Sequence, residues 1–456
     1  MNIVITGAGK VGNTLCGDLV KENHNIIMIE KDESRLEQAI NSFDIGGITG
    51  NGATYDTQME AGVNKCDVFI SVTSDDETNI IAAITAKKLG AKYTIARVRN
   101  PEYSKQVDFL RENLGITLMI NPELDAAQAI ERILLFPAAL NVESFGRGHI
   151  NMVEVIIPDG SPLSGLKLKD YNGRYGNVIV CVVLRGDKVI IPDGEIQFQV
   201  GDHIMVTGNT KNIDSFCNQT QNSISKVRSA LIVGGGRVTN YLVSRLLKLH
   251  MEVKIIENSV DIADKLAAEF PKAEVIFGDG TKQSLLNEEH ITSYDSVIAL
   301  TGIDEENMVL SIYASRMGVP KTITKVSRTD LLKVLDNVGL QSIITPQRLI
   351  ADHIVRFIRS QENSLGSNID AFYRLADGNV EVLQFIAKDS SRAVSIPLSK
   401  LRRKPGILII CIIRGEKVIY PGGNDQILPG DETLIATTNK GFTDLDDILE
   451  ETRGLI

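Results

Sequence analysis

Three glycines and one acid near the start of the sequence could hold a phosphate and a ribose. Gly7, Gly9 and Gly12 follow a short apolar run, and Glu30 comes 18 residues after the last glycine. In such a turn the first glycine permits the tight bend, the second lets a pyrophosphate approach, and the third lets a helix pack close to the sheet. The N–H groups at the start of that helix can bind the phosphate. The spacing therefore predicts a dinucleotide-binding turn.

The carboxylate of Glu30 favours particular nucleotides. It could accept hydrogen bonds from the ribose hydroxyls, and it would repel a 2′-phosphate, which favours NAD(H) or another adenosine nucleotide over NADP(H). The alternative is a solvated glutamate at the end of a strand.

Other polar residues follow the later strands expected in this region. Asn51 could reach an adenine edge or only support its turn, while Thr73 and Ser74 lie at the carboxyl edge of the sheet, where ligands bind in such folds. Arg97 could bind a phosphate or form an ion pair with a surface acid. The acids at 75–77 are explained better as a helix cap and first turn than as metal ligands.

These residues need a parallel sheet to position them. The segments "NIVITG", "NIIMIE", "DIGGITG" and "VFISVTS" are typical of strands, and Val11, Leu15 and Leu19 have the spacing of a buried helical stripe. Strand–helix–strand repetition with short links indicates a doubly wound, Rossmann-like α/β domain.

The chain contains this pattern twice. Gly7 matches Gly234 and Glu30 matches Glu257, in each case 227 positions later. A second segment also repeats: "VCVVLRGDKVIIPDG" at 180–194 resembles "ICIIRGEKVIYPGG" at 410–423, and its Gly-Asp turn predicts a hairpin in a small β-rich module. The order is therefore A, B, A′, B′, and we expect the polar stretch 211–229 to be a linker between the halves.

The second glycine turn departs from the pattern. It keeps Gly234 and Gly236 but has Thr239 in place of the third glycine, which should loosen helix–strand packing, and Lys325 stands where the first copy has Arg97. The second site could bind a different nucleotide, bind more weakly or be empty.

Composition limits the class of protein. The 456 residues are 43% hydrophobic and 23% charged, and the net charge of −10 without a basic stripe argues against a nucleic-acid partner. The longest apolar runs have seven residues, too short for a membrane helix, and the start lacks a signal-peptide pattern, so we expect a cytoplasmic protein. The five cysteines are expected to be buried free thiols, with no metal site.

Catalysis is not indicated. None of the six histidines recurs between the copies, and each nucleotide domain is followed by a module of only about 70 residues. A duplicated binding domain with a duplicated small module suits a sensor, so we expect no catalytic residues and no enzyme. An NAD-dependent oxidoreductase is the rival interpretation, and a regulator of a different cation carrier is another.

In this order the motifs "VITGAGKVG", "GNGATYDTQMEAGVNKCDVFISVTSDDETNIIAA", "INPE", "VGD" and "PGD" resemble the TrkA family, the peripheral nucleotide-binding subunits of Trk potassium uptake systems. The resemblance covers essentially the whole chain. It implies two Rossmann-like RCK N-terminal (KTN) domains at 1–135 and 228–360, each followed by a small α+β RCK C-terminal module, at 136–215 and 368–450.

The resemblance also implies a function. The family subunit forms a homo-oligomeric ring on the cytoplasmic face of the membrane beneath a TrkH-type potassium transport protein. It binds NAD(H) and adenine nucleotides such as ATP or ADP, which regulate K⁺ flux. The cofactor-binding residues carried over by position are Gly7, Ala8, Gly9, Lys10, Val11, Glu30, Asn51, Thr73, Ser74 and Arg97 in the first site, and Gly234, Gly235, Gly236, Arg237, Val238, Glu257, Asp279 and Thr301 in the second.

Two helices with apolar stripes are expected to start at Pro122 and Pro346, directly after the last strand of each nucleotide domain. Each helix could cross to a neighbouring domain or pack on its own domain.

Overall fold

The computed structural model describes residues 1–104, 106–171, 173–220, 226–328, 340–363, 369–375 and 378–450. The chain forms two compact units, each built from two separate stretches of sequence. Unit 1 contains Met1–Glu131 and Val227–Ile358, and unit 2 contains Arg132–Lys226 and the chain from Arg359 onward. The two nucleotide domains therefore belong to one unit and the two small modules to the other.

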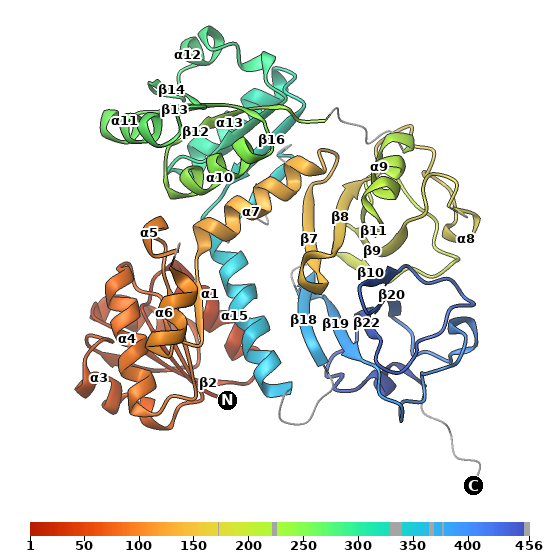
Figure 1. Ribbon diagram of the computed structural model, residues 1–456, viewed down its shortest axis with the longest axis horizontal. Helices are drawn as coiled ribbons and strands as arrows, with labels where there is room; N and C mark the ends of the chain where they lie inside the picture. The colour runs from red at the N-terminus through yellow and green to blue at the C-terminus, as the bar shows by residue number, and fades with distance from the viewer. Residues whose placement is uncertain are drawn as a thin grey trace. The chain divides into compact units, whose positions relative to one another are not determined.

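The first nucleotide domain alternates strands and helices, as the sequence predicts (Figure 1). Its six parallel strands have the order β3-β2-β1-β4-β5-β6, the order of a doubly wound dinucleotide-binding fold. Its elements are β1 (Asn2–Thr6), α1 (Lys10–Val20), β2 (Asn25–Glu30), α2 (Glu33–Ser42), β3 (Gly46–Thr49), α3 (Tyr55–Glu60), η1 (Val63–Lys65), β4 (Val68–Ser71), α4 (Asp76–Leu89), β5 (Tyr93–Arg97), α5 (Pro101–Ser104), α6 (Val107–Leu114), β6 (Leu118–Ile120) and α7 (Pro122–Leu135).

The second nucleotide domain has the equivalent parallel order, β14-β13-β12-β15-β16-β17. Its elements are β12 (Ser229–Val233), α10 (Arg237–Lys248), β13 (Glu252–Glu257), α11 (Val260–Glu269), β14 (Glu274–Phe277), α12 (Gln283–Glu288), η3 (Ile291–Ser293), β15 (Ser296–Ala299), α13 (Asp304–Arg316), β16 (Lys321–Lys325), β17 (Ser342–Ile344) and α15 (Pro346–Asn363).

Apolar residues on both faces of the central strands explain why helices cover both sides of each sheet. Every residue of β4 is buried, and α1 buries the predicted stripe of Val11, Leu15 and Leu19 against the sheet. Strands buried on both faces are characteristic of parallel sheets in α/β domains. The predicted α/β fold class is confirmed.

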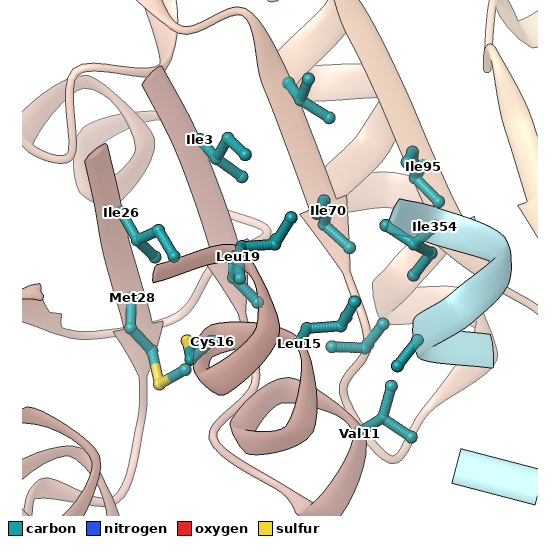
Figure 2. Packing of buried hydrophobic residues seen from close by; sticks show 14 of the residues in the cluster. Ile3, Val11, Leu15, Cys16, Leu19, Ile26, Met28, Ile70, Ile95 and Ile354 are labelled. Atoms are coloured by element: carbon teal, nitrogen blue, oxygen red, sulfur yellow. The ribbon is translucent and has the colours of Figure 1, made fainter. Parts of the chain in front are cut away.

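The helices that begin at Pro122 and Pro346 cross between the two nucleotide domains. Ile354 of α15 lies in the core of the first domain, close to Leu15 and Ile70 (Figure 2). The ring of Phe357, one turn further along α15, packs edge-on against Tyr93 of β5 with centroids 5.8 Å apart. A helix from the second copy thus completes the core of the first.

The reciprocal crossing is made by α7. Asn121, directly before this helix, donates a hydrogen bond to the hydroxyl of Tyr241 in α10 at 2.8 Å, and Glu131 pairs with Arg245 of the same helix. Of the two arrangements compatible with the sequence, the structure therefore has the crossed one, in which each helix contacts the other copy.

Each small module is an antiparallel five-stranded sheet. The orders β10-β9-β11-β8-β7 and β21-β20-β22-β19-β18 are equivalent. The first module consists of β7 (Asn141–Phe145), η2 (Gly146–Gly148), β8 (Ile150–Ile156), α8 (Leu168–Tyr171), β9 (Ile179–Arg185), β10 (Lys188–Ile190), β11 (His203–Thr207) and α9 (Thr210–Gln219). The second consists of β18 (Ile369–Leu375), β19 (Val380–Ile386), η6 (Leu398–Lys400), β20 (Ile407–Arg414), β21 (Lys417–Ile419), β22 (Glu432–Thr437) and η7 (Leu445–Ile448). Residue 368, the predicted start of the second module, lies outside the described residues.

The two modules share one hydrophobic core. Cys181 of β9 and Cys411 of β20 are both buried in this cluster, and the rings of Phe145 and Tyr373 meet edge-on with centroids 4.7 Å apart. All five cysteines are buried and free, as predicted. The predicted hairpin is also confirmed, since Arg185 of β9 pairs with Lys188 of β10 across a two-residue turn.

The predicted linker at 211–229 is wrong over its first half. Residues Thr210–Gln219 form helix α9, which Asn209 caps by accepting a hydrogen bond from the backbone N–H of Asn212. The helix buries Ile213, Phe216 and Cys217, so three apolar residues at helical spacing are enough to fix it to the first module. Residues 221–225 of the predicted linker lie outside the described part of the chain.

The two longest apolar runs form buried strands, as predicted, in β9 and β20. Among the helices that the structure describes, none has both the length and the apolar character needed to cross a bilayer.

Candidate functional site

The first glycine turn connects β1 to α1 and depends on two glycines for its shape. Gly7 has a φ of +107°, a left-handed conformation that side chains rarely adopt. A Cβ atom at Gly12 would lie 2.0 Å from the carbonyl oxygen of Gly7, so only glycine lets α1 start this close to the turn. These are the roles that the spacing predicts for the first and third glycines.

The second glycine of the turn faces open space. A Cβ at Gly9 would meet no atom within 4 Å, and Gly9 is the N-cap of α1, with extended backbone angles and no side chain to satisfy the first N–H groups. Those N–H groups and the positive end of the helix dipole favour an anion at this position. The turn therefore has both the space and the donors that a diphosphate requires.

Glu30, at the end of β2, is fixed beside the turn by backbone donors. Its Oε2 atom accepts a hydrogen bond from the N–H of Ala8 at 2.6 Å, and its Oε1 atom accepts from Lys31 and Asp32 at 2.8 and 3.2 Å. A carboxylate has about four lone-pair positions, so it can still accept from a ribose hydroxyl. This geometry fits the predicted role, and it adds a second one, because Glu30 also holds the glycine turn in place.

A cavity of about 350 Å³ opens at this turn. It is lined by all of the predicted first-site residues except Ala8, namely Gly7, Gly9, Lys10, Val11, Glu30, Asn51, Thr73, Ser74 and Arg97. Ala8 contributes its N–H to Glu30 instead. The volume lies in the range of small-molecule sites, and the fold brings these residues together from the carboxyl ends of five strands and the loops that follow them.

The loop after β4 is held by an asparagine, Asn79, that is not among the predicted site residues. The Oδ1 atom of Asn79 accepts from the N–H and the hydroxyl of Thr73, both at 2.8 Å, and its Nδ2 atom donates to the carbonyls of Thr73 and Arg97. Asn79 therefore joins the ends of β4 and β5. Asn307 makes the matching backbone contacts in the second copy, so its recurrence in the sequence was the available signal.

The nearby acids cap α4. Asp75 is the N-cap and accepts from the N–H of Thr78 at 2.8 Å, while Asp76 accepts from the N–H groups of Arg99 and Asn100. The capping interpretation is confirmed for Asp75. Within the described ranges, no cluster of three or more acidic, histidine or cysteine side chains could hold a metal ion.

Arg97 supplies a partly buried cation to the wall of the cavity. Its guanidinium donates to the carbonyl oxygen of Thr73, and burial lowers the pKa of the Arg97 side chain to about 10. The group is still protonated at neutral pH, and a phosphate nearby would offset the cost of its burial. Asn51, across the cavity, uses its Oδ1 atom to accept from the N–H of Ala53 at 3.2 Å, which leaves its amide nitrogen available for a ligand.

Ten of the residues that line the cavity are not among the predicted set, and three of these have long polar or charged side chains. Lys31 and Arg35 follow Glu30 and add positive charge beside it, and Gln347 belongs to α15 of the second copy. The Oε1 atom of Gln347 is buried and accepts no hydrogen bond from any residue that the structure describes. Nothing in the motif pointed to Gln347, because this residue lies in the second half of the chain and reaches the cavity only through the crossing of α15.

The second glycine turn keeps the backbone geometry of the first. Gly234 has a φ of +104°, Gly236 is the N-cap of α10, and the Oε2 atom of Glu257 accepts from the N–H of Gly235 at 2.5 Å. Arg237 and Val238 begin α10. Thr301 follows β15 and is held by Asn307, as Thr73 is held by Asn79.

Thr239 does not simply loosen the second turn, as the sequence had suggested. It is fully buried, and its hydroxyl donates a hydrogen bond to the carbonyl oxygen of Gly234. This is the carbonyl whose counterpart in the first copy lies 2.0 Å from the Cβ position of Gly12. The second copy thus replaces a close backbone approach with a side-chain hydrogen bond.

The surroundings of the second turn are less suited to an anion. Ile262 stands at the position of Arg35, and a Cβ at Gly235 would lie within 3.0 Å of side-chain atoms of Leu266, Glu257 and Ile262. Asp279, at the position of Asn51, accepts from the N–H and hydroxyl of Thr281 at 3.0 and 2.7 Å. Lys325 occupies the position of Arg97 and donates to the carbonyl of Leu300 at 3.3 Å.

Comparison with known proteins places this architecture in a family. The family profile described as "TrkA-N domain" matches residues 3–122 and 230–346, and the profile described as "TrkA-C domain" matches residues 152–221 and 382–450. Together these matches span the six-stranded sheet of each nucleotide domain and most of each small module.

Curated relatives match over nearly their full length. "Trk system potassium uptake protein TrkA homolog 1" of Methanosarcina mazei is 32% identical over 443 residues, which cover 95% of this chain and 97% of the relative. The homolog of Archaeoglobus fulgidus is 30% identical, with coverage of 95% and 97%, and the TrkA protein of Vibrio alginolyticus is 29% identical, with coverage of 97% for both.

Solved structures share the fold at low sequence identity. The GsuK RCK domain has a TM-score of 0.63 at 14% identity and covers 95% of this chain and 92% of its own. The GsuK channel bound to NAD has a TM-score of 0.62 at 15% identity, with coverage of 96% and 76%. With the two profile matches and the full-length relatives, the resemblance predicted from the sequence is confirmed, and the chain belongs to the TrkA family of Trk system potassium uptake proteins.

Proposed function

We propose that this protein is the nucleotide-sensing regulatory subunit of a Trk-type potassium transport system. In this proposal, NAD(H) or an adenine nucleotide such as ATP or ADP binds in the first cavity and regulates K⁺ uptake through a TrkH-type membrane protein. The subunit acts in the cytoplasm, at the inner face of the membrane, as a homo-oligomeric ring. The names of the full-length relatives support the transport system.

One observation carries the nucleotide part of the proposal. At Gly9 the N-terminus of α1 opens into a cavity of about 350 Å³, with Glu30 at one side and Arg97 in the wall. The helix N–H groups and Arg97 suit a phosphate, and Glu30 suits a ribose. GsuK, which shares the fold, has been solved with NAD, so NAD is the first ligand to test.

Regulation requires that the nucleotide prefer one arrangement of the assembly. A ligand shifts a conformational equilibrium only by its difference in affinity for the two states. We expect the first site to carry this difference, since Lys31 and Arg35 line its cavity and the second copy has Asn258 and Ile262 at the corresponding positions. The second site should bind an anionic nucleotide more weakly.

Calorimetric titration of NADH, NAD⁺, ATP and ADP tests the binding. The variants Gly9→Val and Gly236→Val form a matched pair, because a Cβ at either glycine meets no protein atom within 4 Å. We expect about one tight site per chain, lost in Gly9→Val and retained in Gly236→Val. Loss only in Gly236→Val would place the tight site in the second copy.

Potassium flux through a reconstituted TrkH-type protein tests the regulatory role. We expect flux with the wild-type subunit to depend on nucleotide, and flux with Gly9→Val not to. Equal flux with and without a nucleotide that calorimetry shows to be bound would contradict the proposal. Nicotinamide absorbance measured in parallel would detect turnover if the protein were an oxidoreductase.

A further inference from the structure

One ion pair joins each nucleotide domain to the crossing helix of the other copy. In the first domain, Asp18 of α1 lies 3.5 Å from the guanidinium of Arg348 in α15. In the second, Arg245 of α10 lies 2.5 Å from the carboxylate of Glu131 in α7. Both pairs lie within unit 1.

The internal repeat shows that these pairs have opposite polarity. Asp18 and Arg245 occupy the same position of the equivalent helices α1 and α10, 227 positions apart. The domain surface is therefore acidic at this point in the first copy and basic in the second. Each crossing helix carries the complementary charge, Arg348 on α15 and Glu131 on α7.

The carboxylates of Asp18 and Glu131 are both shielded from water, so the loss of either ion pair should be costly. The side chain of Asp18 is 8% exposed and that of Glu131 is 15% exposed. Removing the partner of a buried charge is strongly destabilising, because the charge is left without compensation.

A pair of like domains from two chains would lose both interactions. If α7 of one chain lay on α1 of another, Glu131 would face Asp18, and Leu124 would stand in the place of Arg348. If α15 lay on α10, Arg348 would face Arg245, and Val355 would stand in the place of Glu131. Each like pairing brings two charges of the same sign together and takes from each of them its partner on the other copy. Asp18 would keep the ion pair with Lys21 of its own helix at 3.9 Å, and Arg348 the one with Asp352 of its own helix at 3.4 Å.

We propose that Asp18, Arg348, Glu131 and Arg245 form a charge code that pairs unlike nucleotide domains and prevents like domains of two chains from pairing. The partner selected by each domain is the other copy, with complementary charge on its crossing helix. Specificity of this kind arises as much from repulsion in the wrong complex as from attraction in the right one. Every pair then contains one first site and one second site.

Reversing both charges of one ion pair tests the choice of partner without removing the ion pair that stabilises the unlike domains. In the double variant Asp18→Arg with Arg348→Asp, opposite charges still meet when unlike domains pair. When two first domains pair, Glu131 would now face an arginine. When two second domains pair, Arg245 would now face an aspartate. The double variant Glu131→Arg with Arg245→Glu has the same effect on the like pairs. It is the cleaner reversal, because Asp18 and Arg348 also pair with Lys21 and Asp352 of their own helices. Reversing all four charges restores the repulsion in both like pairs.

A disulfide reporter measures like pairing in the full-length chain. Asp125 of α7 lies 3.6 Å from His353 of α15, and Ala129 is the residue of α7 equivalent to His353. In a pair of first domains, residue 125 of one chain would therefore meet residue 129 of the other. We would co-express one chain carrying Asp125→Cys with another carrying Ala129→Cys, oxidise the purified protein, and quantify the interchain dimer on a denaturing gel.

We expect little dimer with the native charges, a rise on the order of tenfold in either double reversal, and a return to the native level when all four charges are reversed. Tenfold corresponds to about 1.4 kcal/mol, a modest value for exchanging repulsion for attraction between partly buried charges. Similar melting temperatures for the four backgrounds would exclude misfolding as the cause. Equal dimer in all four backgrounds would overturn the charge code without affecting the nucleotide site.

Discussion

At the scale of single residues, the two glycine turns solve one packing problem in two ways. Gly12 avoids a clash by having no Cβ, whereas Thr239 converts the same approach into a hydrogen bond to Gly234. We expect Gly12→Ala to lower the free energy of unfolding by about 1–3 kcal/mol, the usual cost of overpacking. Urea unfolding measures this effect. Gly9→Ala is the control, since its methyl group enters open space, and an equal loss in both variants would contradict the packing argument.

Glu30 should set the choice of nucleotide. Its carboxylate is held by three backbone N–H groups beside the cavity, where it would meet the ribose. We expect the wild type to bind NADH more tightly than NADPH, because the carboxylate repels a 2′-phosphate. Replacing Glu30 with glutamine should weaken NADH binding about tenfold, consistent with the loss of a hydrogen bond to a charged group. The same variant should also reduce the preference for NADH over NADPH.

Calorimetry with both dinucleotides measures this preference, and Glu257→Gln in the second copy is the matched control. Equal affinity of the wild type for NADH and NADPH would show that Glu30 serves the turn alone. Lys31 and Arg35, which line the same cavity, would then be the natural partners of a 2′-phosphate.

The placement of the motif residues around the first cavity could be predicted because it depends on local structure. A left-handed turn needs Gly7, and a strand end places Glu30 beside it, so spacing along the chain is enough. The position of Arg35 on the cavity wall depends on how α2 packs, and motif spacing does not report that. The hydrogen bond of Thr239 depends on a side-chain rotamer, which explains why the substitution pattern alone suggested looser packing.

At the scale of elements, α9 shows how a polar sequence can still form a fixed helix. Phe216 is 1% exposed and packs against Tyr171, with ring centroids 6.2 Å apart. We expect Phe216→Ala to destabilise the first module by about 3–5 kcal/mol, the range for removing a buried aromatic side chain. Urea unfolding and limited proteolysis near 211–219 measure this, with the exposed Lys211→Ala as the control. An unchanged unfolding curve would show that this segment does not stabilise the first module and acts as a linker.

Helix α15 should stabilise the domain that it enters, and not the one that precedes it in the sequence. Ile354 is fully buried in the core of the first domain. We expect Ile354→Ala to cost about 2–5 kcal/mol and to speed amide hydrogen exchange in β1 and β4 more than in β12 and β15. Val309→Ala, at an exposed position of α13, is the control. Faster exchange confined to β12 and β15 would contradict the crossed arrangement.

At the scale of the whole molecule, the order A, B, A′, B′ could be predicted, but the grouping of its parts could not. Repeats are visible in a single sequence because equivalent positions keep similar residues. The apolar stripes of α7 and α15 are similar, so hydrophobicity does not specify which domain each helix covers. The opposite charges at Asp18 and Arg245 do distinguish the two arrangements, but their meaning depends on the contacts that the structure brings together.

The crossing of α15 connects the first cavity directly to the second half of the chain. Gln347, in the first turn of α15, lines the first cavity, and its buried Oε1 atom has no donor among the described residues. An unsatisfied buried acceptor costs about 1–3 kcal/mol, which a ligand hydroxyl or amine could recover. Because α15 packs on the first domain and continues past Ile358 into unit 2, a nucleotide that binds Gln347 should order this helix.

We expect NADH to slow amide hydrogen exchange in the first turns of α15 but not in α13. The variant Gln347→Ala should lose this protection, although it should still bind NADH, with an affinity a few-fold weaker. Gly9→Val should show no protection at any concentration, and full protection of α15 in Gln347→Ala would mean that the coupling runs through another contact.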